Sequence, residues 1–153
     1  MIKRNKLDKT FGPIGKSAGI VLFVSGLIMT YSSLVGLILV LPGAFIGFSS
    51  TMTFVDFDKK RVKFSNNIFG IIPIGKWMTI QSDMKIGIKK SNNAWRGYSK
   101  SNRTVDITDI DYRLILYDSN DKEIMPIQKS KTLDSAKLNL DKISKELGIS
   151  VIE

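Results

Sequence analysis

The sequence predicts a membrane α-helical hairpin joined to an α+β domain that is mostly β. Three observations predict this class. The 39 residues from 17 to 55 contain no Asp, Glu, Lys or Arg, whereas the rest of the 153-residue chain is richly charged. Apolar and polar residues then alternate through much of 51–128, which is typical of half-buried strands. Near the C-terminus, apolar residues recur at steps of three and four, which indicates one amphipathic helix.

The uncharged tract is too long for a single membrane helix, because a bilayer core of roughly 30 Å needs only about 20 helical residues. We therefore expect a hairpin over residues 17–50, with helices at about 14–30 and 34–50. The polar cluster at 30–33 separates them and suits an interface. A secretory signal peptide would also start with basic residues, but this tract is longer than such a signal and lacks a convincing cleavage site.

Basic residues flank both ends of the tract. Residues 1–16 are interpreted as a basic cytoplasmic tail, and a second basic cluster follows the hairpin at 59–63. The positive-inside rule then predicts a multi-pass protein of the cytoplasmic (inner) membrane with both termini in the cytoplasm. A transporter or channel would need ionisable groups inside the tract, so the hairpin is interpreted as an anchor.

Two glycines of the second predicted helix, Gly43 and Gly47, have GxxxG spacing. This spacing permits close approach of another helix. The alternative interpretation is that glycine is simply common in membrane helices.

Residues 51–153 are expected to form the soluble domain, with six to seven antiparallel strands joined by turns. The polar segment 90–103 is expected to be a long loop, and Pro126 indicates that its strand lies at an edge or a bulge. The stripe of apolar residues predicts a C-terminal helix at 133–147, with Thr132 capping its start and Gly148 its end. Its apolar face must cover the strand assembly.

This order of hairpin, strands and terminal helix resembles the bacterial pleckstrin-homology-like (PH-like) domain membrane proteins with two N-terminal transmembrane helices. The resemblance covers residues 17 to about 148 and includes the segment FGIIPIGKW, Phe69–Trp77. It is architectural and contains no catalytic motif. It implies that the helix caps one end of a bent sheet or barrel, and that the domain binds or scaffolds.

Composition argues against an enzyme. The chain has no Cys and no His, which removes thiol nucleophiles and the commonest general base and metal ligands. The run GIIPIGK has P-loop spacing, but Trp77 replaces the Mg²⁺-binding Ser or Thr and no helix is expected to follow. We therefore predict no catalytic residue, no cofactor and no metal. An enzyme that uses Asp or Lys remains an alternative that no constellation supports.

The cluster Lys59, Lys60, Arg61 and Lys63 is one candidate binding site. In PH domains that resemble this fold, basic residues around the corresponding hairpin hold lipid phosphates. Each basic side chain near an anionic leaflet gains roughly 1 kcal/mol. The alternative is a topology signal in a solvated turn.

The segment 89–103 is a second candidate, as an interface for a partner. Its mixed aromatic and cationic side chains could contact a membrane, a protein or single-stranded nucleic acid. The alternative is a solvated loop whose Trp packs back on the domain. The candidate residues are Trp95, Arg96, Tyr98, Lys100 and Arg103.

Asp106, Asp109 and Asp111 form a short acidic cluster that could bind a hard cation. The cluster lacks the glycine and the distal Glu of an EF-hand loop. We favour salt bridges from the strand edge to Arg103 or Arg113.

Together these patterns predict a non-enzymatic, membrane-anchored binding or scaffolding protein. Its expected partner is a protein, with anionic lipid as a further contact and no nucleic acid. The alternative is an accessory subunit of a larger integral membrane complex, in which the hairpin packs against other helices.

Overall fold

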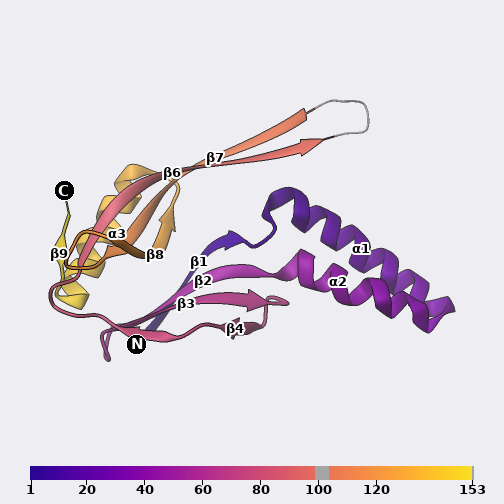
Figure 1. Ribbon diagram of the computed structural model, residues 1–153, viewed down its shortest axis with the longest axis horizontal. Helices are drawn as coiled ribbons and strands as arrows, with labels where there is room; N and C mark the ends of the chain where they lie inside the picture. Colours follow the sequence, from indigo (N-terminus) through magenta and orange to yellow (C-terminus); the bar gives the residue numbers. More distant parts are fainter. Residues whose placement is uncertain (99–103, 153) are drawn as a thin grey trace.

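The computed structural model describes residues 1–98 and 104–152, and of residues 93–98 and 104–107 it describes the backbone alone. A helical hairpin extends from one end of a β domain built of two sheets (Figure 1). The C-terminal helix packs on the β domain at the end away from the hairpin. The class predicted from the sequence, apolar helix followed by a mostly β domain with a C-terminal helix, is therefore confirmed.

The first sheet has five strands in the described part of the chain. Its path runs β1 (Ile2–Lys9), β2 (Ser50–Asp56), β3 (Arg61–Ile68) and β4 (Ile72–Ile74), and β5 (Trp77–Thr79) also pairs with β3. Every pairing in it is antiparallel.

Strand β1 and the first residues of α1 occupy the segment 1–16 that was expected to be a basic tail. The inward positions of β1 hold Lys3, Asn5 and Leu7, of which only Leu7 is apolar, so the sequence lacks the apolar alternation that marks a strand. The strand is held instead by its ladder with β2 and by a hydrogen bond from Asn5 Nδ2 to Ile127 O of the other sheet. The chain segments before and after the hairpin thus lie side by side.

The second sheet has the order β8 (Glu123–Ser130), β7 (Thr104–Tyr117), β6 (Lys85–Tyr98) and β9 (Ser150–Val151). The pairing of β6 and β7 continues to Tyr98 and Thr104, so strand occupies most of the segment that the sequence predicted to be a loop. Strand β9 pairs parallel to β6, which the all-antiparallel prediction missed. Edge strand β8 carries a register shift beside Pro126, as expected.

The hydrophobic core lies between the two sheets and the C-terminal helix. Val55 and Val62 come from the first sheet, and Leu114 and Leu116 come from the second. All four are fully buried. Apolar side chains of this kind each gain roughly 1.5–3 kcal/mol on burial, which is the main stabilisation of the domain.

Helix α3 (Leu133–Leu147) has the predicted bounds. The Thr132 hydroxyl accepts a hydrogen bond from Ser135 N, and Gly148 ends the helix in the left-handed conformation at φ 70°. Ala136, Leu140, Ile143 and Leu147 are buried against the strands. Leu133, at the start of the predicted stripe, is instead exposed.

The hairpin consists of α1 (Gly12–Ser32), a 3₁₀ turn η1 (Leu34–Gly36) and α2 (Leu37–Phe48). The sequence predicted two helices of equal length, and this is wrong. Among the helices that the structure describes, only α1, with 21 residues and a length of about 31 Å, is long and apolar enough by itself to cross a bilayer. Helix α2 has 12 residues, or about 18 Å. It is short because Ser33 breaks the helix and the 3₁₀ turn takes up the first residues of the predicted second helix.

Candidate functional site

Helices α1 and α2 meet along their glycines. A Cβ placed on Gly19 would lie 2.4 Å from Gly47 N, and a Cβ placed on Gly43 would lie 2.4 Å from Phe23 N. Both distances are far below any real contact, so only glycine permits this separation of the two backbones. The GxxxG pair therefore makes the contact within the hairpin, and it faces α1 rather than another protein.

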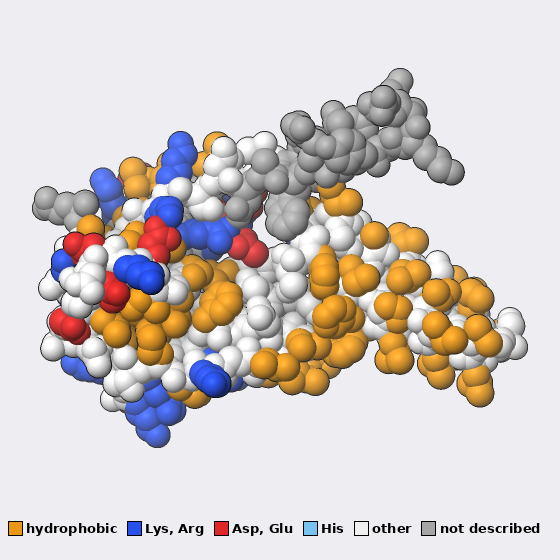
Figure 2. Space-filling model, in the orientation of Figure 1, with side chains coloured by type: hydrophobic (Ala, Val, Ile, Leu, Met, Phe, Trp, Pro, Cys, Tyr) orange, Lys and Arg blue, Asp and Glu red, His pale blue; other side chains and the backbone are white. Residues whose placement is uncertain are grey.

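The large apolar side chains of the hairpin point outward. Along the two helices, orange side chains cover the surface that projects from the β domain (Figure 2). An apolar surface of this extent would be strongly unfavourable in water, and it is normal against lipid. The side chains that are half or more exposed include Val21, Ile28, Leu34, Val35, Ile38 and Leu41.

Three hydroxyl groups of the hairpin make local hydrogen bonds to the backbone. The Thr30 hydroxyl donates to Gly26 O at 2.8 Å, and the Ser17 hydroxyl donates to Pro13 O at 3.1 Å. Ser33 Oγ accepts from Val35 N where the chain turns. Such internal bonds are required wherever water is absent.

The apolar surface continues onto the β domain at the turn between β3 and β4. Ile71 at its tip is 80% exposed, and Ile72 and Ile74 are also exposed. The turn sits directly against the end of α2, where Phe69 packs edge-on against Phe45 with ring centroids 5.8 Å apart. The first part of the FGIIPIGKW segment is thus a protruding apolar turn at the base of the hairpin, and the segment continues through β4 to Trp77 of β5.

Three lysines surround a small cavity at the same level on the other side of β2. Lys6 and Lys9 come from β1 and Lys16 comes from the first turns of α1. Desolvation and the neighbouring ammonium of Lys16 lower the pKa of Lys9 below its usual value. From the sequence, these three lysines could be interpreted only as charges that set the membrane orientation, because nothing in the sequence shows that they converge.

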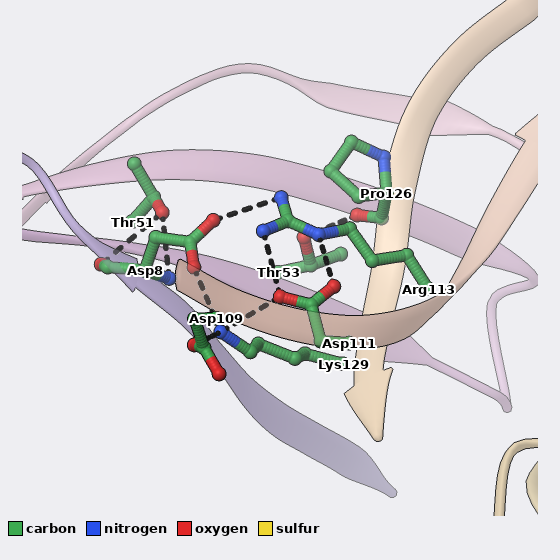
Figure 3. Close-up of polar contacts among 8 residues, drawn as sticks. All are labelled: Asp8, Thr51, Thr53, Asp109, Asp111, Arg113, Pro126 and Lys129. Carbon is green, nitrogen blue, oxygen red and sulfur yellow. Dashed lines mark hydrogen bonds and ion pairs between the residues drawn. The ribbon is translucent and has the colours of Figure 1, made fainter. Parts of the chain in front are cut away.

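An ion network joins the two sheets just beyond this base (Figure 3). Asp8 of β1 contacts Arg113 of β7 at 2.8 Å and Lys129 of β8 at 3.3 Å. Asp111, which is 1% exposed, contacts the same two cations, each at 2.8 Å. The network fixes the strand that leads into α1 onto the second sheet.

Charge pairing decides the protonation of this network. Burial raises the pKa of Asp111, but hydrogen bonds from Arg113 and Lys129 outweigh it and hold the pKa below its usual value. For Lys129, burial lowers the pKa, and hydrogen bonds to Asp109, Asp111 and Asp8 raise it above its usual value. Asp111 and Lys129 therefore stay charged near neutral pH.

The salt bridge predicted between the acidic cluster and Arg113 is confirmed for Asp111. Asp109 pairs with Lys129 at 2.8 Å. The side chain of Asp106 lies outside the described residues. Within the part of the chain that the structure describes, no group of three or more acidic residues is arranged to hold a metal ion.

The predicted lipid-binding cluster lies in the turn between β2 and β3 and the start of β3, at the end of the sheet away from the hairpin (Figure 1). Seven strand residues, about 23 Å, separate the end of α2 from this turn. Arg61 pairs with buried Asp56 at 3.0 Å and lies over the Trp77 ring, 4.5 Å from its centroid. Lys63 Nζ donates to Pro73 O at 3.2 Å. Of the four basic residues, only Lys59 and Lys60 are exposed.

The predicted partner interface at 89–103 is described only in part. The side chains of Trp95, Arg96 and Tyr98, and the whole of Lys100 and Arg103, lie outside the described residues. The backbone of the first three belongs to β6.

A groove between α3 and the second sheet is a further candidate surface. It has a volume of about 380 Å³, and its floor is apolar, with Tyr112 and Leu140 among the lining residues. Lys90 and Lys137 also line it. The sequence missed this groove, because its walls come from four separate segments of the chain.

Comparisons with protein-family models, with curated proteins and with solved structures give no match for this chain.

Proposed function

We propose that this chain is a non-enzymatic, membrane-anchored binding or scaffolding protein. Its hairpin crosses the cytoplasmic membrane twice and displays a PH-like domain at the cytoplasmic face. Two sheets followed by a helix that packs over the core support the PH-like assignment. In this placement, the polar end of the β domain next to the hairpin lies at the lipid headgroups, and the apolar turn at Ile71 reaches into the membrane interface.

The observation that carries this proposal is the packing of the hairpin. Its glycines are inside and its large apolar side chains are outside, which is the arrangement of helices surrounded by lipid. Helix α1 matches a bilayer core of roughly 30 Å. Helix α2 and the 3₁₀ turn together reach only about 24 Å, so the membrane would thin slightly at the hairpin or α1 would tilt.

Single-cysteine labelling tests the membrane topology, because the chain has no native Cys. Ser33→Cys at the hairpin tip and Asn120→Cys in the β7–β8 turn would each be treated with a membrane-impermeant maleimide, in sealed right-side-out and inverted vesicles. We expect Ser33→Cys to react only in right-side-out vesicles and Asn120→Cys only in inverted ones. Protection of Ser33→Cys in both would show that the hairpin is re-entrant, and carbonate release of the chain would exclude insertion altogether.

The groove beside α3 is the proposed binding surface for a partner protein. Its mostly apolar lining and two lysines suit an apolar side chain flanked by acidic residues. A photo-crosslinking residue at Leu133 in the groove is expected to give an adduct of discrete mass in native membranes. The same residue at Leu138, on the same helix but outside the groove, is the matched control. Equal adducts at both positions, or none at Leu133, would refute this surface.

The second candidate is an accessory subunit of a larger membrane complex. The GxxxG pair does not favour it, since Gly43 and Gly47 face α1. The favouring observation is the outward apolar face of α2, which could pack on other helices. Blue-native electrophoresis after mild extraction separates the candidates: a discrete band well above the monomer supports the complex, and a monomer supports the anchor.

A further inference from the structure

The fold collects three positive charges around one cavity. Lys6, Lys9 and Lys16 line it together with Gly47 and the segment 48–50. The cavity is small, about 90 Å³, so it admits a single phosphate group rather than a whole lipid headgroup. Like charges held close together repel each other, and a bound anion would remove that cost.

A β-bulge in β1 produces this convergence. Lys6 pairs with Met52 and Lys9 pairs with Ser50, so three steps along β1 oppose two steps along β2. In a regular strand, residues three apart point to opposite faces. The bulge re-aims the chain, and both lysines line the same cavity.

The same bulge sends the nearest carboxylate elsewhere. Asp8 lies between the lysines in sequence, but it contacts Arg113 and Lys129 of the second sheet. Among the described residues, no Asp or Glu lines the cavity. The positive charge is therefore not neutralised from within the protein, in contrast to Arg61 of the distal cluster, which has Asp56.

From this geometry we propose that the cavity formed by Lys6, Lys9 and Lys16 binds the phosphate of an anionic lipid headgroup. The source is a lipid because the cavity lies where the chain enters and leaves the hairpin, at the level of the apolar turn on the other side of β2. This step rests on the proposed membrane placement. The basic residues at 59–63 are at the wrong end of the sheet to share this role.

The test measures the thermal stability of the purified full chain in a neutral detergent as phosphatidylglycerol is added. Ligand binding to the folded state raises the melting temperature, and we expect a rise of roughly 5 °C. Phosphatidylcholine and inorganic phosphate are parallel arms. The test variant is K6Q/K9Q/K16Q, and the matched control K59Q/K60Q/K122Q loses the same charge from exposed turns.

The proposal expects the rise with phosphatidylglycerol in wild type and control, and its loss in the test variant. K6R/K9R/K16R should retain it, and this variant keeps the test decisive if the glutamine variant fails to fold. An equal rise in control and test variants, an equal rise with phosphatidylcholine, or no rise in wild type would overturn it. A rise with inorganic phosphate alone would keep the cavity as an anion site and overturn its lipid source. Failure of membrane insertion would appear separately, in the maleimide labelling.

Discussion

The hairpin and the β domain of this chain are packed in opposite senses. In the β domain, Leu114 and Ile143 are inside and lysines are outside, whereas in the hairpin Gly19 and Gly43 are inside and leucines and isoleucines are outside. Leucine and isoleucine are therefore buried in one region of this 153-residue chain and exposed in the other. Each region places toward its surroundings the groups that those surroundings solvate best, so the reversal supports the lipid environment proposed for the hairpin.

The boundary between the two regions combines both kinds of packing. Phe45 and Phe69 link the hairpin to the β3–β4 turn, while Asp8 links the strand before the hairpin to Arg113 and Lys129. Aromatic and charged contacts thus meet at one level. In the proposed placement, this level is where the membrane surface changes from apolar to polar.

The largest expected difference in stability is between leucine-to-alanine substitutions in the two regions. Leu114→Ala removes a fully buried side chain and should lower the free energy of unfolding by about 3–4 kcal/mol. Leu41→Ala removes an outward side chain of α2 and should change it by less than about 0.5 kcal/mol. Urea denaturation of the full chain in detergent measures both. Equal losses would mean that Leu41 is packed against protein, and the reversed packing would be refuted.

The stability of the protein should be next most sensitive to substitutions in the ion network that joins the two sheets. Asp111→Ala leaves Arg113 and Lys129 without their shared buried partner and should cost about 3 kcal/mol. The exposed pair of Lys89 and Glu123 is the control, and Glu123→Gln should cost less than about 1 kcal/mol. A small effect at Asp111 would show that the boundary is not fixed by charge.

The pH dependence follows from the depressed pKa of Asp111. Its ordinary pKa is about 3.9 in the unfolded chain. The stabilisation is therefore fully present above about pH 4 and is lost as the pH falls through the lower folded value. Melting temperatures between pH 2 and pH 7 should show this loss, and Asp111→Asn should remove that part of the dependence. An unchanged acid profile in Asp111→Asn would contradict the assignment.

A smaller effect on stability is expected from a substitution at the contact between α1 and α2. Gly43→Ala adds a methyl group that meets the Phe23 backbone, so the helices must separate, at a cost of about 2 kcal/mol. Ala18→Leu adds more volume to α1 at an exposed position and should leave stability unchanged. Thermal unfolding in the same detergent compares them. Equal tolerance would mean that the two helices are not in close contact.

The smallest effect on stability is expected at the apolar turn. Ile71→Cys should change the free energy of unfolding by less than about 1 kcal/mol, because the side chain is largely exposed. A fluorophore on this cysteine should nevertheless be quenched by lipids that carry a spin label near the headgroup. A fluorophore at Asn120→Cys should not be. Equal quenching at both positions, or none at Ile71→Cys, would contradict an interfacial turn.

Local patterns explain which elements could be predicted. Helix α3 has the predicted bounds, because its apolar period and both caps are encoded within about 17 consecutive residues. The salt bridge of Asp111 with Arg113 was also predicted, because the two are neighbours on one strand face. Strand β1 was missed, because its ladder and its partners on β8 are separated from it by some 40 to 125 residues.

By itself, the sequence determined that this chain has an uncharged hairpin, a strand-rich domain and a terminal helix, since charge and hydrophobic period are local properties. Only the tertiary structure decided that α2 is too short to span alone, that Gly43 and Gly47 face α1, and which lysines converge. The convergence depends on a bulge and on pairing between β1 and β2, which lie on either side of the hairpin. Proximity of that kind is a property of the folded backbone, and residue spacing along the chain does not encode it.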